Sequence, residues 1–302
     1  MVAVPTIPAA DWAITPQLVA QLLADQCPDL AGRAVTPFSH GWDNVMYRLG
    51  DDLVIRLPRR RAAVTLIENE IRWLPTIAGS LPAFTSLPVF VGSATDDYPT
   101  RWTVAPFAHA RTAADVAVSE RTPAAEGLAD FFVALHRTAP VNAPANPGRG
   151  TALGRPEMQA RVLDRIGRRP AQSAALADRW RAWSGAPGWS GPTVWLHGDA
   201  HPLNLLLDHD GRLAGVIDWG DITSGDPACD LAVGWLMFDE AGRRRFTERG
   251  APNPAYDADI WTRAKAWGLY FGLFFAEQAD DMPRLQRIGE DALARLLDEP
   301  LG

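Results

Sequence analysis

Three side chains whose types suit phosphoryl transfer lie close together in the C-terminal half of the 302-residue chain. Asp199 is followed five residues later by Asn204, and Asp218 comes after two short apolar runs. Transfer of a γ-phosphoryl group needs a carboxylate that orients the acceptor hydroxyl and takes its proton. It also needs oxygen ligands for the Mg²⁺ that screens the triphosphate, and Asn and Asp side chains carry such oxygens. The three residues are therefore candidates for a phosphoryl-transfer site.

A predicted hairpin would bring these side chains together. The runs Leu205–Leu207 and Leu213–Ile217 are apolar, and a polar, glycine-containing turn separates them, which is typical of two antiparallel strands. Asn204 precedes the first strand and Asp218 follows the second, so pairing of the strands places both at the open end of the hairpin. Both can then reach one metal ion, with Asp199 in the loop that leads into the hairpin.

The surroundings of these residues are strongly acidic. Seven aspartates and one arginine lie between residues 197 and 230, in a chain whose formal net charge is -7. Carboxylates beside a triphosphate would repel it unless divalent cations lay between them. Asp208 and Asp210 fit a solvated turn. Asp199 and Asp218 instead lie next to apolar runs, where a carboxylate usually has a partner or a function.

The same stretch carries a longer ordered pattern. Its members are His197–Asp199, Asn204, Ile217–Trp219, Gly225–Pro227 and Asp230–Ala232. The pattern resembles the aminoglycoside phosphotransferase family, which are small-molecule kinases with a protein-kinase-like fold; the protein-kinase catalytic loop has the same five-residue interval between its Asp and Asn. The resemblance implies that Asp199 is the catalytic base, that Asn204 and Asp218 bind Mg²⁺, and that His197 and Asp230 hold the catalytic loop by hydrogen bonds.

The N-terminal part of the chain predicts a small sheet with helices. A helix capped by Thr15 is expected to about Ala24, and a second helix carries an apolar stripe that runs from Leu66 to Leu74. The pattern predicts five strands, over residues 33–38, 45–49, 53–57, 87–92 and 101–105.

One acidic and one basic residue in this region favour an ion pair. Glu70 lies on the apolar stripe of its helix, where an ionised carboxylate is costly unless it is paired. Arg56, on the preceding strand, is the expected partner. In protein kinases a strand Lys paired with a helix Glu positions the α- and β-phosphates, and Arg56 with Glu70 resembles that pair with Arg in place of Lys. A purely structural ion pair remains the alternative.

Two further segments are candidates for nucleotide contacts. The loop expected over residues 39–44 is small and polar, so backbone N–H groups near Ser39 and Gly41 would be free for phosphate oxygens. Residues 102–107 are the expected hinge, where an adenine would bond to the backbone. Pro106 has no N–H, which leaves Ala105 and Phe107 as the expected donors. ATP and GTP both remain open.

The resemblance also implies an overall organisation. We expect an α+β, two-lobed protein-kinase-like fold. The small lobe, residues 1–106, would hold a mostly antiparallel five-stranded sheet plus a helix and bind the nucleotide. The larger, mainly helical lobe, residues 107–302, would carry the catalytic hairpin and bind the acceptor.

In the C-terminal part, a buried helix is expected over residues 230–238 and a long aromatic helix over residues 259–279. In the family, helices of this region form the wall of the acceptor site, and carboxylates there hold cationic antibiotics. By resemblance, the candidate substrate-binding residues are Asp239, Glu240, Glu277, Asp280 and Asp281, together with Asp221, which is also a candidate to support the metal site. A solvated surface position is the alternative for each of them.

Composition excludes several other classes. A net charge of -7 argues against a nucleic-acid binder. The chain has a single lysine, Lys265, outside any Gly-Lys-Ser/Thr motif, which excludes a P-loop. Cys27 and Cys229 lack metal-ligand spacing and fit reduced thiols. Because no leader-like or membrane-spanning apolar run is present, we expect a cytoplasmic protein without membrane or nucleic-acid partners, and a monomer.

The predicted function is that of an NTP-dependent O-phosphotransferase, with ATP or GTP as co-substrate and Mg²⁺ as cofactor. Its acceptor would be a hydroxyl of a small cationic antibiotic, namely an aminoglycoside, a viomycin- or capreomycin-type peptide or a macrolide, and its action would confer resistance. The alternative is a metabolic kinase of the choline, homoserine or methylthioribose type. More distant alternatives are a non-enzymatic binding module and a metal-dependent hydrolase that uses His197 and His201.

Overall fold

In the computed structural model, which describes residues 8–278 and 282–301, the chain divides into two units by its internal contacts. The first unit comprises Met1–Gly79, Phe84–His109 and Asp218–Ile222, and the second comprises Ser80–Ala83, Ala110–Ile217 and Thr223–Gly302. The sequence predicts a boundary between two lobes after residue 106. The observed division differs from that boundary most clearly at residues 218–222, which follow the hairpin in sequence but belong to the first unit.

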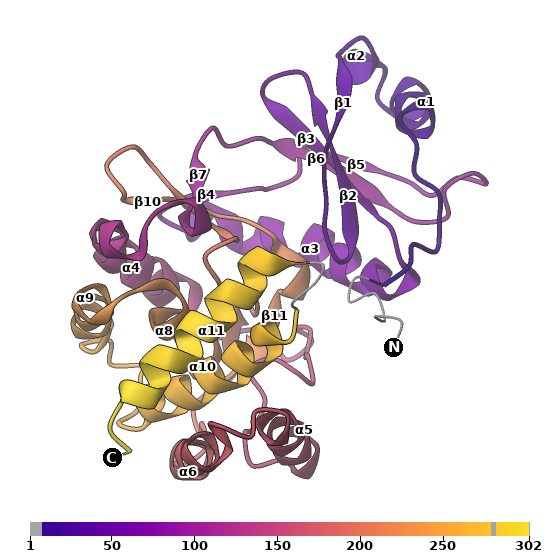
Figure 1. Ribbon diagram of the computed structural model, residues 1–302. Coiled ribbons are helices and arrows are strands. Elements are labelled where there is room, and N and C mark those ends of the chain that lie inside the picture. Colours follow the sequence, from indigo (N-terminus) through magenta and orange to yellow (C-terminus); the bar gives the residue numbers. More distant parts are fainter. Residues whose placement is uncertain (1–7, 279–281, 302) are drawn as a thin grey trace. The chain divides into compact units, whose positions relative to one another are not determined.

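The first unit contains the predicted antiparallel five-stranded sheet, in the strand order β1-β2-β3-β6-β5 (Figure 1). Its strands are β1 (Val35–His40), β2 (Asn44–Leu49), β3 (Leu53–Pro58), β5 (Phe90–Gly92) and β6 (Trp102–Pro106), and the short β4 (Phe84–Thr85) lies between α3 and β5 in sequence. The register pairs Arg56 of β3 with Met46 of β2 and with Thr103 of β6. The expected antiparallel five-stranded sheet of an α+β fold is therefore confirmed.

Helices of this unit are α1 (Pro16–Gln26), α2 (Pro28–Ala31) and α3 (Val64–Ile77). The side chain of Thr15 accepts a hydrogen bond from the Leu18 N–H at 3.2 Å, so the predicted N-cap forms. One face of α1 and alternate residues of the sheet bury a common core, as binary patterning dictates. Its members include Val19, Leu22, Leu23, Tyr47, Leu49, Ile55, Leu57, Trp102 and Val104.

The second unit is mainly helical and also holds short strands. Its helices are α4 (Ala125–Leu135), α5 (Pro156–Gly167), α6 (Ser173–Ser184), α7 (Ala228–Leu231), α8 (Val233–Met237), α9 (Glu240–Gly250), α10 (Ile260–Ala276) and α11 (Pro283–Asp298). Its strands are β7 (Arg111–Thr112), β8 (Val194–Leu196), β9 (Leu205–Leu207), β10 (Leu213–Val216) and β11 (Thr223–Gly225). The 3₁₀ helices of the chain are η1 (Arg61–Ala63), η2 (Ala78–Ser80), η3 (Ala113–Asp115), η4 (Val118–Glu120), η5 (Thr122–Ala124) and η6 (Trp219–Asp221).

Helices α10 and α11 pack side by side (Figure 1). Their close approach depends on Gly289, because a Cβ there would lie 2.3 Å from the backbone nitrogen of Ala276 and 2.7 Å from the carbonyl oxygen of Gly272. Such distances are far below van der Waals contact. This packing fixes α10, whose aromatic side chains line the neighbourhood of the site described below.

Three predicted elements differ from the structure. The helix expected over residues 230–238 is two short helices, α7 and α8, because the chain tightens at Ala232, whose carbonyl accepts the Trp235 N–H at 3.1 Å in a 3₁₀-type bond. The strand expected from residue 87 begins only at Phe90, since Pro88 has no N–H for a ladder. The predicted long helix ends at Ala276; its expected last residue, 279, lies outside the described residues.

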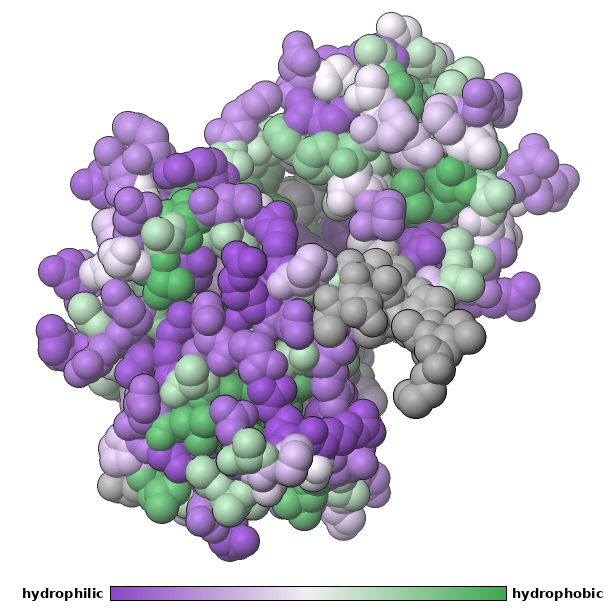
Figure 2. Space-filling model, in the orientation of Figure 1, coloured by the Kyte–Doolittle hydropathy of each residue, from purple (hydrophilic) through white to green (hydrophobic). Residues whose placement is uncertain are grey.

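The visible surface is largely hydrophilic, with small hydrophobic patches between polar side chains (Figure 2). The large hydrophobic side chains that are exposed are Phe38, Val89, Val133, Val141, Leu163 and Leu301. Within the described part of the chain, no helix combines the length and the hydropathy needed to cross a bilayer.

Candidate active site

A buried carboxylate, that of Asp230, holds the loop that carries Asp199 by hydrogen bonds to its backbone. Asp230 accepts the backbone N–H groups of His197 and Gly198 at 2.8 and 2.9 Å. His136 lies behind it, with Nε2 3.2 Å from the Asp230 carboxylate and Nδ1 2.7 Å from the Tyr256 hydroxyl. Because Asp230 is only 1% exposed, these bonds replace its lost hydration and hold the loop in one conformation.

Replacing Asp230 with Asn should therefore destabilise the fold. The amide keeps one acceptor but points its own N–H at a backbone donor, so we expect the free energy of unfolding to fall by about 2–4 kcal/mol. Asp208→Asn is the matched control, because Asp208 also accepts two backbone N–H groups, but in an exposed turn where water can replace them. Urea unfolding of both variants checks this, and equal losses would contradict it.

Asp199 and Asn204 are in contact in this loop. The Asn204 side-chain amide donates to the Asp199 carbonyl oxygen at 3.0 Å and lies 3.4 Å from its carboxylate. Asn204 is buried, and the Asp199 side chain retains 21% of its exposure. The amide nitrogen of Asn204 thus holds the loop, while its side-chain oxygen is the kind of ligand that Mg²⁺ takes.

Two basic side chains flank the Asp199 carboxylate. Arg149 donates from Nη2 to Oδ1 at 3.2 Å, and His201 Nε2 lies 3.3 Å from Oδ2. Burial alone would raise the pKa of Asp199, but His201 and Arg149 outweigh it and hold the pKa well below its usual range. Asp199 is therefore ionised at neutral pH, as an acceptor for a hydroxyl proton must be.

The predicted hairpin forms. Val216 of β10 pairs with Leu205 of β9, and the Ile217 N–H donates to the Asn204 carbonyl at 2.9 Å. His197 also connects the loop to the hairpin, because its Nε2 donates to the Ile217 carbonyl at 3.0 Å. The two ends of the hairpin therefore lie side by side, and Asp218 is the residue bonded to Ile217 in sequence.

Asp218 itself packs within the first unit. It has a φ of 64°, which among the described residues is a positive value found otherwise only at glycines. Such a conformation costs about 1–3 kcal/mol for most residues, although Asp tolerates it better than branched side chains. Its side chain accepts a bond from Arg56 Nη2 at 2.8 Å and remains 51% exposed. A strained, half-exposed carboxylate beside a buried cation is typical of a functional site.

The predicted ion pair between Arg56 and Glu70 forms. Arg56 Nη1 lies 2.9 and 2.7 Å from the two Glu70 oxygens, and both side chains are almost fully buried. Burial raises the pKa of Glu70 and the Arg56 charge opposes this rise. One guanidinium thus serves two carboxylates, Glu70 and Asp218, which keeps Arg56 protonated despite burial.

Loss of the Glu70 charge should destabilise the first unit. Glu70→Gln removes one buried partner of Arg56, so we expect the free energy of unfolding to fall by about 2–4 kcal/mol. Glu68→Gln, on the same helix, is the control: Glu68 is half-exposed and pairs with Arg101 at 3.1 Å, so its loss should cost less than about 1 kcal/mol. Thermal or urea unfolding compares the two, and a cost that is no larger for Glu70→Gln would contradict the assignment.

The expected phosphate loop is shorter than predicted. Ser39 and His40 are part of β1, where they pair with Met46 and Val45. The Gly41 N–H donates to the Asn44 carbonyl at 2.8 Å, so the prediction that it is free is wrong. A nucleotide role for Ser39 or Gly41 stays a prediction.

The backbone N–H groups predicted as hinge donors are directed toward a neighbouring strand and not toward a ligand. The Phe107 N–H donates to the Asp52 carbonyl at 2.7 Å, and Ala105 pairs with Val54 of β3. Alternate residues of a strand direct their N–H groups to the same side, so the N–H groups of Ala105 and Phe107 both point toward β3. The side away from β3 presents the carbonyl of Pro106, which is an acceptor and not a donor.

The predicted acidic substrate residues that the structure describes belong to different elements. Asp239 caps α9 by accepting the Gly242 N–H at 2.9 Å, and Glu240 is exposed in the first turn of that helix. Glu277 ends α10 and pairs with Arg165 at 3.1 Å and Arg168 at 3.4 Å. Asp221 belongs to η6 in the first unit. Asp280 and Asp281 lie outside the described residues.

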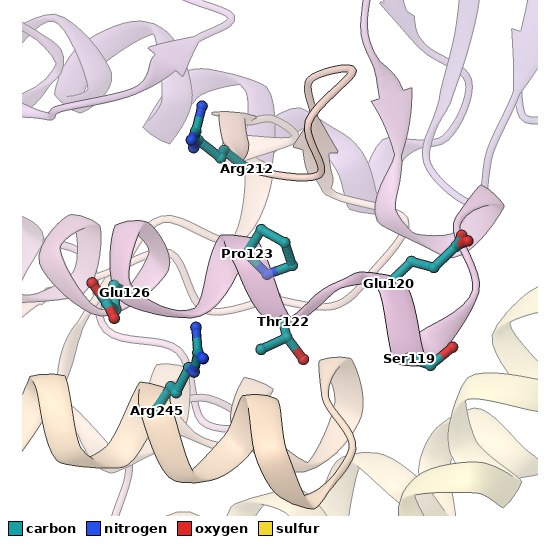
Figure 3. Close-up of a pocket in the computed structure, with 7 residues that line it drawn as sticks. All are labelled: Ser119, Glu120, Thr122, Pro123, Glu126, Arg212 and Arg245. Atoms are coloured by element: carbon teal, nitrogen blue, oxygen red, sulfur yellow. The ribbon is translucent and has the colours of Figure 1, made fainter.

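A surface cavity of about 510 Å³ lies elsewhere on the second unit (Figure 3). It is lined by Ser119, Glu120, Thr122, Pro123, Glu126, Arg212 and Arg245. None of these belongs to the predicted site. Its charged side chains, of both signs, are exposed, so the cavity identifies no particular ligand.

Sequence reasoning missed Arg149, whose side chain bonds to the Asp199 carboxylate. Arg149 comes from the segment between α4 and α5, which is rich in Pro, Gly and Asn and shows no periodicity. Nothing in the local pattern indicates that its side chain reaches Asp199. In the part of the chain that the structure describes, no three His, Cys, Asp or Glu side chains gather as a metal-binding group.

The fold and the site together define a class, the protein-kinase-like phosphotransferases. Residues 34–267 match the model of the phosphotransferase enzyme family. The match covers more than half of the chain, so the chain belongs to this family, which confirms the resemblance and the expected class of enzyme. The hydrolase and the non-enzymatic alternatives are set aside by this membership.

Solved structures with the same fold cover nearly the whole chain. The GDP and kanamycin complex of APH(2″)-IIIa has a TM-score of 0.68 at 18% identity, over 91% of this chain and 98% of that one. Macrolide 2′-phosphotransferase MphH from Brachybacterium faecium has a TM-score of 0.61 at 20% identity, over 93% and 98%. At these identities the likeness shows the fold.

Curated relatives match over shorter segments. The uncharacterized protein YcbJ of Bacillus subtilis is 32% identical over 126 residues, which is 40% of this chain and 40% of the relative. A thiamine kinase of Shigella sonnei is 28% identical over 104 residues, or 34% of this chain and 36% of the relative. The chain thus spans well under half the length of these relatives.

Proposed function

We propose that the chain transfers the γ-phosphoryl group of ATP or GTP to a hydroxyl group of a small molecule, with Mg²⁺. The observation that carries the proposal is the Asp199–Asn204 contact in a loop fixed by Asp230, next to the hairpin that leads into Asp218. This supplies an ionised carboxylate for the acceptor and amide and carboxylate oxygens for the metal, each on a rigid support.

Asp199 accepts the hydrogen bond of the acceptor hydroxyl and takes its proton as the hydroxyl oxygen bonds to the γ-phosphorus. The bond from that phosphorus to the β–γ bridging oxygen breaks, and the nucleoside diphosphate leaves. Arg56, held by Glu70, binds the phosphates that are not transferred, because a guanidinium suits phosphate geometry. Most of the acceleration would come from positioning and electrostatics.

Asn204 and Asp218 fit a magnesium ion by donor type. Hard oxygen ligands from one or two side chains, completed by phosphates and water, are what Mg²⁺ usually takes. The ion would screen the triphosphate charge. Asp218 would supply a carboxylate oxygen to the ion, and Arg56, which Glu70 also holds, would supply guanidinium N–H donors to the phosphates.

Two acceptor classes are candidates. The first is a cationic antibiotic, since the structural neighbours include a kanamycin complex and a macrolide phosphotransferase; turnover of such an acceptor would confer resistance. The second is a metabolite, supported by the similarity to thiamine kinase and by the arginine beside Asp199. A monomer in the cytoplasm stays a prediction.

One experiment tests the proposal. Release of ADP or GDP is measured with a panel of aminoglycosides, cyclic peptides, macrolides, choline, homoserine and thiamine, with Mg²⁺ or with EDTA. The proposal expects acceptor-dependent release that needs Mg²⁺. Release that is independent of every hydroxyl compound and of the metal would contradict it.

A further inference from the structure

The segment that carries Arg149 packs against β8, the strand that leads into the loop of Asp199. Gly150 has a φ of 60°, and a Cβ there would lie 2.3 Å from the Leu196 side chain of β8. Its carbonyl accepts the Asp226 N–H at 2.9 Å. A Cβ at Gly225 of β11 would lie 2.2 Å from the same carbonyl oxygen. Two glycines thus permit a backbone contact that larger residues would prevent.

This backbone packing holds the Arg149 guanidinium beside the Asp199 carboxylate. The group lies 4.9 Å from the centre of the Phe271 ring of α10 and 3.2 Å from the Asp199 carboxylate, and it also donates to the Gly148 carbonyl at 3.2 Å. The side chain is 13% exposed. A guanidinium packed on a ring and bonded to a carboxylate has little freedom to leave.

More positive charge follows along the same aromatic face. Arg165 lies 4.9 Å from the Phe274 ring, and Arg161 donates to the Tyr270 hydroxyl at 3.4 Å. The one acidic candidate described in this neighbourhood, Glu277, is already shared by Arg165 and Arg168. Among the described residues of this aromatic face, the arginines therefore outnumber the one carboxylate, and that carboxylate is already paired.

An acceptor hydroxyl that bonds to Asp199 must come alongside the Arg149 guanidinium. The group next to that hydroxyl then faces a fixed cation in a partly desolvated place. An ammonium group there is repelled, whereas a carboxylate or a hydroxyl oxygen can accept guanidinium N–H bonds.

We propose that Arg149 is a specificity-determining residue that selects an acceptor whose hydroxyl neighbours an oxygen acceptor, most strongly a carboxylate, and rejects one whose hydroxyl neighbours an ammonium group. The inference rests on the proposed function and names the acceptor class for that same site. It favours hydroxy acids and polyols over amino alcohols and polyamines.

The test uses the full chain with Mg²⁺ and a non-hydrolysable ATP analogue. Calorimetric titration measures the binding of three related compounds that differ in charge next to a hydroxyl: gluconate, glucose and glucosamine. We expect gluconate to bind most tightly and glucosamine least. Arg149→Gln should weaken gluconate binding about tenfold or more and abolish the order, and Arg149→Lys should keep it.

Arg155→Gln is the matched control, because Arg155 is a half-exposed arginine of the same segment that bonds to Thr151 and lies 3.7 Å from Glu157. It should leave the order unchanged. Glucosamine as the tightest ligand, an unchanged order in Arg149→Gln, or no gluconate binding at its highest soluble concentration would each overturn the inference.

A separate readout distinguishes this inference from the proposed function. Asp199→Asn should lower acceptor-dependent nucleotide turnover by about 10²–10⁴-fold yet keep the order of the three ligands, since Arg149 remains. If turnover needs Asp199 but the order is absent, only the selectivity inference fails. If Asp199→Asn turns over nucleotide as fast as the wild type, the proposed function fails whatever the ligand order.

Discussion

Replacing Asp199 with Asn should lower kcat by about 10²–10⁴-fold, the usual contribution of a positioned proton acceptor, and leave nucleotide affinity nearly unchanged. The amide has the size of the carboxylate but cannot take a proton from the acceptor hydroxyl. Steady-state kinetics with Mg²⁺ and a nucleotide titration of the same variant separate the two effects.

The low pKa of Asp199 shapes this expectation. A carboxylate held strongly ionised by His201 and Arg149 is a weak base in water. In phosphoryl transfer the hydroxyl proton leaves late, so orienting the hydroxyl matters more than basicity. Asp210→Asn is the control, because Asp210 is an exposed carboxylate in the neighbouring turn. Equal kcat values for the wild type and Asp199→Asn would contradict the assigned role.

Replacing Asp218 with Asn should weaken nucleotide binding about 10- to 100-fold in the presence of Mg²⁺. Asn tolerates the positive φ of this position, so the backbone is preserved while the charge that would bind the metal is lost. Without Mg²⁺ the loss should vanish, because an anionic side chain beside a triphosphate then only repels it.

The measurement is nucleotide titration of both proteins with Mg²⁺ and with EDTA. Asp52→Asn is the matched control in the same unit, because Asp52 is an exposed carboxylate that pairs with Arg33. A loss of the same size with and without metal would show that Asp218 acts through Arg56 alone and would contradict its role as a ligand.

The elements that the sequence predicts well are those with strong local patterns. The hairpin follows from two apolar runs and a turn in which Gly211 adopts a φ of 76°. The Arg56–Glu70 pair follows from two periodicities, since a carboxylate on an apolar stripe needs a cation on the facing sheet.

The details that the sequence misses depend on backbone partners that the local pattern does not specify. Whether the Phe107 N–H is available depends on β3, which takes it, and the Gly41 N–H is taken by the Asn44 carbonyl within its turn. Arg149 is an extreme case. Its place beside Asp199 depends on the contact between Gly150 and Gly225, two residues that are far apart in sequence and have no pattern in common.

The most direct test of the central claim is phosphorus NMR of the full chain with Mg²⁺, ATP or GTP, and the acceptor panel. The account predicts a new phosphate monoester signal with the wild-type protein, which is lost in EDTA and grows about 10²–10⁴-fold more slowly with Asp199→Asn. An ester that forms as fast in Asp199→Asn as in the wild type, or a wild-type protein that turns over nucleotide only to inorganic phosphate with every acceptor, would contradict it.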